Sequence, residues 1–175
     1  MTLEQRVARL EAIEAIKCLK ARYFHACDTK QPERVRDCFA PGPITLEYGR
    51  VGEFSDREQM LEVFTRLACS EHIVEMHHGQ NPQITVHGDD EASGTWGLYY
   101  YLIDTQQQTA TQLAGFYDDR YRRVDGEWLI VASRYQVSST QVLDLSGEQL
   151  KAIFAGSEAP RELDDPERQA SSGDS

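Results

Sequence analysis

Apolar residues recur every three or four positions along the first part of the chain, with charged residues between them. This spacing predicts one long amphipathic helix over residues 2–28. Pro32 starts a short second helix over 32–39, and Ser55 with Glu58 has the spacing of a capping box before a third helix over 56–68. The residues of the first apolar stripe are Leu3, Val7, Leu10, Ile13, Ile16 and Leu19.

After residue 72 the pattern changes to runs of β-branched, aromatic and alternating apolar residues. These runs predict strands over 72–78, 82–88, 92–104, 109–124 and 127–138, in addition to an early strand over 44–48. Turn sequences separate them: NP, GDDE, QQQ and, as the strongest hairpin signal, the DG of RRVDGEWLI. Helices followed by a mostly antiparallel sheet indicate an α+β fold.

The length of 175 residues suits one domain with a full core, expected over residues 1–155. Residues 156–175 are polar and acidic and are expected to form a disordered tail. The net charge of −11 disfavours nucleic acid as a partner, because the phosphate backbone repels an acidic surface. No apolar run is long enough to cross a bilayer, and the N-terminus reads as a helix rather than as a signal peptide. We therefore expect a cytoplasmic protein that acts on neither nucleic acid nor membrane.

Neither the cysteines nor the histidines have the spacing of a metal site. The four cysteines, at positions 18, 27, 38 and 69, contain no CxxC pair and are expected to be reduced and mostly buried thiols. His77 and His78 cannot bind the same ion from one strand, because neighbouring side chains point to opposite faces. Phosphate-binding and nucleophile-elbow motifs are also missing from the sequence. We expect no metal and no cofactor. The densest group of metal-ligand types is His72, Glu75, His77 and His78.

A curved sheet that wraps helices leaves a concave face in which a pocket can form. The end of the first helix offers Tyr23, Phe24 and Asp28, although Tyr23 and Asp28 lie about 140° apart around an ideal helix. Most tyrosines of such a domain belong to the core rather than to a site. Strand residues that alternation assigns to the pocket wall are Tyr48, then Trp96, Leu98, Tyr100 and Leu102 on one face, then Phe116 with Asp118.

Three stretches resemble the SnoaL-like group of the nuclear transport factor 2-like superfamily: EAIKCLKARYFHACDTK, MHHGQNPQITVHGDDEASGTWGLYYYLI and GFYDDRYRRVDGEWLI. Within that group the chain looks most like the bile-acid 7α-dehydratases, and it is more distantly similar to scytalone dehydratase. The resemblance implies an α+β fold in which a cone-shaped, curved and mostly antiparallel sheet wraps around the N-terminal helices.

Carried over residue by residue, the dehydratase pattern implies catalytic roles for Tyr23, Asp28 and His77. A pocket acid of that family falls near Tyr100 and a pocket arginine near Val137, so this chain departs from the pattern at both positions. The substrate-binding residues that we expect from the resemblance and from the shared strand faces are Tyr48, Trp96, Leu98, Tyr100, Leu102 and Phe116.

The choice between the two adjacent histidines is a point of conflict. Alternation counted from Val74 and Met76 assigns His78 to the apolar face, whereas the resemblance assigns the catalytic role to His77. A β-bulge near the following turn would re-aim the side chains and reconcile the two. We expect His77 to face the pocket.

These residues together imply a cofactor-independent hydro-lyase. A neutral histidine would remove a proton made acidic by a conjugated ketone, and Asp28 would orient its ring. The phenols of Tyr23 and Tyr48 would donate either to the developing oxyanion or to the departing hydroxyl. The expected substrate is a hydroxylated 3-oxo-4-ene steroid or bile-acid derivative, a small apolar polycyclic molecule. The alternatives are a ketosteroid-type isomerase or polyketide cyclase in the same pocket, and a non-catalytic module that binds a small ligand or a partner. The resemblance also implies a homo-oligomer, a trimer in preference to a dimer.

Overall fold

The structure is a computed structural model that describes residues 1–147, 150, 152, 155 and 156. The tail predicted from residue 156 onward therefore lies, beyond its first residue, outside the described residues. The elements in chain order are α1 Leu3–Asp28, α2 Pro32–Arg36, β1 Thr45–Glu47, the 3-10 turn η1 Gly49–Val51, β2 Glu53–Phe54, α3 Arg57–Ala68, β3 Ile73–Val86, β4 Glu91–Asp104, β5 Thr109–Val124 and β6 Glu127–Asp144.

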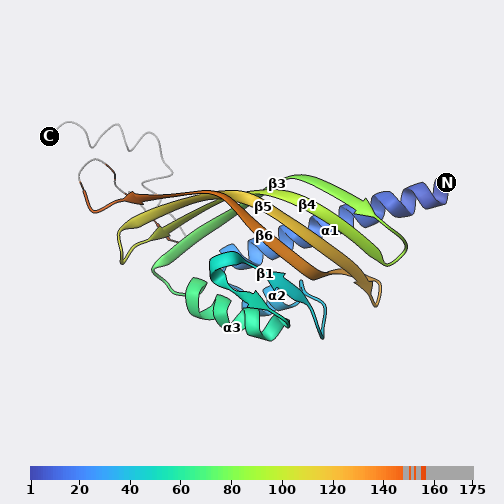
Figure 1. The fold of residues 1–175 in the computed structure, drawn as a ribbon, viewed down its shortest axis with the longest axis horizontal. Helices are drawn as coiled ribbons and strands as arrows, with labels where there is room; N and C mark the ends of the chain where they lie inside the picture. Colours follow the sequence, from blue (N-terminus) through green and yellow to red (C-terminus); the bar gives the residue numbers. More distant parts are fainter. Residues whose placement is uncertain (148–149, 151, 153–154, 157–175) are drawn as a thin grey trace, which may run out of the picture.

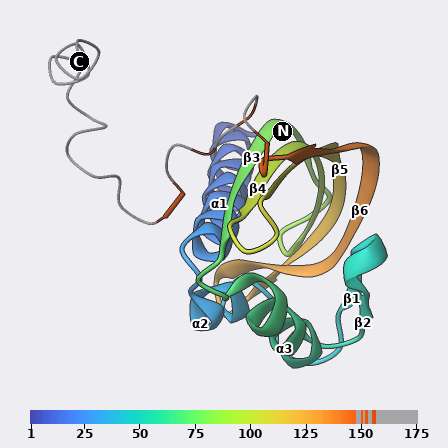
Figure 2. The same cartoon turned by 90° about the vertical axis from the view of Figure 1, so that its left-hand side faces the viewer.

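The strands form one six-stranded sheet in the order β2-β1-β6-β5-β4-β3. All neighbours are antiparallel except β1 and β6, so the α+β fold with a mostly antiparallel sheet is confirmed. The sheet curls from β3, next to α1, round to β6 and the short β1–β2 pair, with α3 across its open side (Figure 2). The core lies inside this curl.

The long helix α1 is where the sequence predicts it, but only its second half is packed. Leu3 and Leu10, on the predicted apolar stripe, are 72% and 66% exposed, and burial begins at Ile16. Figure 1 shows the reason, because the N-terminal turns of α1 extend beyond the sheet. The apolar stripe is real, yet the sheet reaches only its C-terminal part. Among the described helices, none has the length and apolarity needed to cross a membrane.

Three local expectations are corrected. The NP dipeptide does not end a strand, because β3 continues through it with a register shift between Gln80 and Gln83, where Asn81 adopts a φ of 51°. The predicted cap of the third helix is shifted by one residue, since the Asp56 side chain accepts the N–H of Gln59 and caps α3. The last strand also runs further than expected, to Asp144.

The DG hairpin is confirmed. Asp125 and Gly126 adopt φ values of 50° and 87° between β5 and β6, the two positive values that a two-residue turn of this kind requires. The pairing of the two longest strands starts at this turn, and a register shift between Arg120 and Tyr121 then places Tyr117 opposite Tyr135. Two tyrosines of the concave face are thereby brought together, with ring centroids 4.7 Å apart.

A buried ion pair joins α1 to the inside of the sheet. The side chains of Lys20 on α1 and Asp119 on β5 are both fully buried, with Nζ 2.7 Å from Oδ2. Asp119 also accepts the hydroxyls of Tyr121 and Ser133, at 2.7 and 2.6 Å. The Lys20 ammonium lies 3.8 Å from the centre of the Tyr117 ring. Burial lowers the pKa of Lys20, and the Asp119 carboxylate opposes this shift.

Replacing Lys20 by Met should destabilise the protein strongly. The substitution leaves the Asp119 charge buried without its partner, which typically costs about 3–5 kcal/mol. Urea denaturation should show this loss in the free energy of unfolding, whereas Lys17→Met, at an exposed position of the same helix, should change it by less than about 0.5 kcal/mol. Equal stability of Lys20→Met and the wild type would contradict the role of the pair.

Candidate active site

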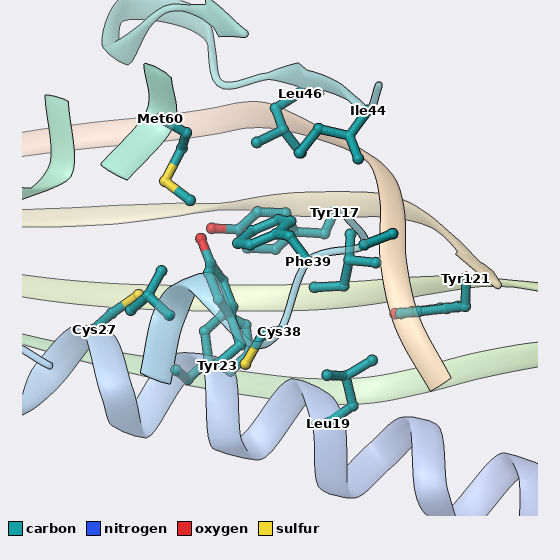
Figure 3. Close-up of a cluster of buried hydrophobic side chains, with 14 of the residues drawn as sticks. Leu19, Tyr23, Cys27, Cys38, Phe39, Ile44, Leu46, Met60, Tyr117 and Tyr121 are labelled. Carbon is teal, nitrogen blue, oxygen red and sulfur yellow. The ribbon is translucent and has the colours of Figure 1, made fainter. Parts of the chain in front are cut away.

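A cavity of about 260 Å³ lies inside the curl of the sheet, between α1, α3 and strands β3 to β6. Its wall is mostly apolar, with polar groups contributed by five tyrosines, Glu75 and His77. Leu19, Tyr23 and Cys27 rise from successive turns of α1 toward Tyr117 and Met60 on the opposite side (Figure 3). Val51 and Leu67 belong to the wall and are more than half exposed, so they mark the opening. The site is therefore an apolar pocket with few polar groups.

His77 faces this cavity and is held by Asp28 at the end of α1. Oδ1 of Asp28 lies 2.6 Å from Nδ1 of His77, and the backbone N–H of His77 donates to the same carboxylate at 3.0 and 3.2 Å. Because a carboxylate only accepts hydrogen bonds, Nδ1 must carry a proton. In a neutral ring Nε2 then has a free lone pair, which is the state that a general base needs.

His77 has the orientation that the resemblance implies, and His78 is exposed on the other face of β3. The residue that anchors the inward face is Ile73, with Glu75 and His77 at alternate positions, whereas Val74 and Met76 belong to the outer face. Met76 is 51% exposed. The bulge invoked to reconcile the two readings lies after this stretch, between Gln80 and Gln83. The conflict came from counting the alternation from two apolar residues that do not face the core.

The His77 ring is also held by the close packing of α1 against β3. Phe24 stacks on His77 with ring centroids 5.5 Å apart and planes 13° from parallel. Gly79, two residues further along β3, leaves the space that the Phe24 ring occupies, since an added Cβ would overlap that ring. The glycine therefore allows the Phe24 ring to approach β3 and stack on His77.

Glu75 is a second polar group of the cavity wall that the sequence analysis considered only as a metal ligand. The Tyr100 hydroxyl on β4 donates to Oε2 of Glu75 at 2.6 Å, and the Tyr100 ring lies 4.7 Å from the His77 ring. Burial raises the pKa of Glu75, an effect that His77 and the Tyr100 hydroxyl partly oppose. The position of Glu75, two residues from both Ile73 and His77 on one strand, could have predicted from the sequence that it faces the cavity.

The remaining polar groups are buried phenols. Burial raises the pKa of both Tyr23 and Tyr48, so each hydroxyl stays protonated at neutral pH and is a hydrogen-bond donor. The hydroxyls of Tyr48 and Tyr135 are buried and make no hydrogen bond within the described residues. Burial also raises the pKa of Tyr135, to about 12. Buried polar groups normally have partners, and these two hydroxyls have unused capacity beside the cavity.

Comparison with known proteins places this arrangement in a family. Residues 8–134 match the family described as the SnoaL-like domain. The chain belongs to this family. Its fold is similar to that of a putative scytalone dehydratase from Novosphingobium aromaticivorans, with a TM-score of 0.73 and 18% identity over 86% of this chain and 95% of that one. It is also similar to the hexachlorocyclohexane dehydrochlorinase LinA-type3 from Novosphingobium barchaimii, with a TM-score of 0.74 and 16% identity over 85% and 99%.

Most of the expected pocket residues line the cavity of this SnoaL-like domain. Tyr23, Tyr48 and His77 belong to its wall, and Asp28 stands behind His77 rather than in the wall. This explains how Tyr23 and Asp28 serve one site from different sides of α1. On β4, Leu98, Tyr100 and Leu102 line the cavity as predicted.

Trp96 and Phe116 are not part of the cavity wall, and the expectation that they line it is corrected. Trp96 is on the inward face of β4 but lies toward the other end of the core, where its indole N–H donates to the Tyr121 hydroxyl at 2.8 Å. Phe116 alternates with the inward Tyr117 and therefore points outward, with 56% of its surface exposed. The apolar residues that sequence analysis missed come largely from α3: Met60, Val63, Phe64, Leu67 and Ala68.

The cysteines of the SnoaL-like domain are free, with Cys27 and Cys38 buried, Cys18 exposed and Cys69 intermediate. Cys27 belongs to the cavity wall, and burial raises the pKa of its thiol well above the ordinary value. Within the described residues, no three His, Cys, Asp or Glu side chains are grouped as metal ligands.

Alkylation of Cys27 by iodoacetamide should report this environment. The thiolate is the reactive form, so with a raised pKa its rate should increase about tenfold per pH unit and reach no plateau by about pH 10, where a thiol of ordinary pKa has levelled off. Peptide mass mapping of the native protein gives the rate at each cysteine. The same peptide in urea should level off near the ordinary thiol pKa of about 8.5. A plateau in the native protein at the same pH as in urea, or below it, would contradict the assignment.

Proposed function

We propose that this protein is a cofactor-independent lyase that eliminates water from a hydroxylated cyclic ketone, with His77 as the general base. The observation that supports this most directly is the His77–Asp28 pair, which leaves Nε2 of a histidine in the cavity wall with a free lone pair. The similar structures include proteins named a dehydratase and a dehydrochlorinase, and both names denote eliminations. Elimination begins with removal of a proton from carbon, which is the step that a positioned neutral imidazole serves.

The reaction would use the cavity groups in sequence. Nε2 of His77 takes a proton from the carbon made acidic by the conjugated ketone, and Asp28 stabilises the imidazolium that forms. The negative charge moves to the ketone oxygen, where the protonated phenols of Tyr23 and Tyr48 donate hydrogen bonds to it. The C–O bond then breaks, and the leaving oxygen departs as water once it has accepted a proton.

The substrate class in this proposal is a 3-oxo-4-ene steroid or bile-acid derivative with a 7-hydroxyl group. Support comes from the sequence stretches that resemble bile-acid 7α-dehydratases, and from the apolar wall and apolar rim residues Val51 and Leu67. Ligand sites commonly measure about 300–1,000 Å³, so a cavity of about 260 Å³ would enclose the reacting rings while the rest of the substrate extends through the opening.

The test is the ultraviolet spectrum of a 7-hydroxy-3-oxo-4-ene bile acid, offered as both 7-epimers, during incubation with the protein. Dehydration extends the conjugation and produces a new band at longer wavelength. His77→Gln should lower kcat by about 10²- to 10⁴-fold, the contribution typical of a general base. His78→Gln is the matched control and should stay within about threefold of the wild type. A spectrum unchanged by the wild type with either epimer would contradict the proposal.

We also propose that the protein is a cytoplasmic homo-oligomer, a trimer in preference to a dimer. The outer face of the sheet supports self-association, because Met76, Tyr99 and Phe116 on three neighbouring strands expose apolar surface there. Four free cysteines agree with a reducing compartment.

Phe116→Glu should shift the protein to monomers of 19.9 kDa in sedimentation velocity, because the charge would be buried unpaired at the interface. Arg122→Glu, six residues along the same face and about 20 Å away, serves as the control and should leave the assembly intact. A monomeric wild type at micromolar concentration would contradict the assembly.

A further inference from the structure

We infer that Glu75 is the general acid of this pocket and delivers the proton with which the substrate's hydroxyl group leaves as water. This inference rests on the proposed elimination and names the group that completes it. The elimination requires two proton transfers, one from carbon and one to the leaving oxygen. His77 accepts the proton from carbon, and a second group of the same cavity must donate the proton to the leaving oxygen.

Geometry assigns this role to Glu75 among the acids near the cavity. Glu75 and His77 are both in the cavity wall, two residues apart on the inward face of β3, so their Cα atoms are separated by about 7 Å. An acid and a base at this separation can serve neighbouring ring positions of one substrate. Asp28 stands behind His77 and is already engaged by two N–H groups of that residue.

The contacts of Glu75 leave one carboxyl oxygen available. Oε2 accepts the Tyr100 hydroxyl, and Oε1 has no hydrogen-bond partner among the described residues. Glu75 makes no ion pair there either, since the nearby Lys30 ammonium donates to the backbone carbonyl of Ser70. A carboxyl group in an apolar wall without a cation tends to hold its proton, as the upward pKa shift of Glu75 indicates.

The proton balance closes within the pocket. Nε2 of His77 gains the proton from carbon, the electron pair of that C–H bond forms the new conjugated double bond, and the C–O bond breaks as Glu75 protonates the oxygen. Water leaves, with imidazolium and carboxylate remaining. Return of the proton from His77 to Glu75 restores the starting state, so no external acid is consumed.

The groups that face Glu75 determine how its titration responds to substitution. They are Tyr100 on β4, His77 on β3, Cys27 and Asp28 on α1, Lys30 after α1 and Cys69 after α3. The Tyr100 hydroxyl donates to the carboxylate and so favours the ionised form. Tyr100→Phe should therefore raise the pKa of Glu75 and move the high-pH limb of the kcat profile to higher pH, which makes Tyr100 a positioning residue.

The deciding experiment compares two leaving groups. The substrates are a 7-hydroxy-3-oxo-4-ene steroid and its 7-chloro analogue, because chloride leaves without a proton. Glu75→Gln keeps an oxygen for the Tyr100 hydroxyl but has no acidic proton. It should lower kcat on the hydroxy substrate by about 10²-fold or more and on the chloro substrate by less than threefold. His77→Gln is the control and should be impaired on both.

A readout without turnover accompanies this comparison. Infrared difference spectra of wild type against Glu75→Gln, recorded across a pH series, should show the protonated carboxyl band of Glu75 titrating with a midpoint above the ordinary glutamate pKa of about 4.3. A midpoint at or below the ordinary value, or equal losses on both substrates, would overturn the role of Glu75 while the elimination stands. A wild type inactive on both substrates would overturn the proposed function itself, and the assignment of Glu75 with it.

Discussion

The position of α1 against the sheet depends on one interaction, the buried pair of Lys20 and Asp119. Charges in an apolar interior are costly unless they meet their partner and their hydrogen bonds, so α1 can neither slide nor rotate without breaking the 2.7 Å contact. Tyr23 lies one turn of the helix further along, and Asp28 two turns. The Lys20 ammonium also packs on the Tyr117 ring of the cavity wall. The pair therefore sets the placement of the groups that α1 contributes to the pocket.

Besides this pair, the Asp28 carboxylate at the end of α1 ties the helix to β3. The Asp28 carboxylate accepts both the ring N–H and the backbone N–H of His77, so it fixes the ring and the strand together. The Phe24 ring, stacked on the imidazole, and the Tyr100 ring, 4.7 Å from it, restrict its rotation. A side chain held in this way loses little freedom when a ligand binds, which is the benefit of a preorganised site.

The sequence predicted the fold class, three helices and most strand limits, because the apolar periods are long and regular. The prediction of which side chains face the pocket failed where apolar residues lie on the outer face of the sheet as well as in the core. Met76 looks like a core residue by its chemistry but belongs to the outer face, so alternation alone favoured the wrong histidine. Phe116 was assigned to the pocket from its strand, although a position one residue away from Tyr117 must point outward. The contribution of α3 to the wall depends on how the helix crosses the open side of the sheet, which no local pattern encodes.

Two carboxyl groups near one histidine illustrate how environment separates chemical roles. Asp28 is surrounded by N–H donors of His77, while Glu75 lies in an apolar wall with a phenol as its partner. Carboxyl groups placed in such different surroundings are suited to different tasks: Asp28 holds the His77 ring, and Glu75 has the role of proton donor that we infer for it. The resemblance places a pocket acid near position 100, and here Tyr100 instead holds the carboxyl of Glu75 from the neighbouring strand. Because adjacent strands share a face, an acid supplied by β3 reaches the same cavity as one supplied by β4. The departure at Tyr100 is thus compatible with a complete acid–base set in this pocket.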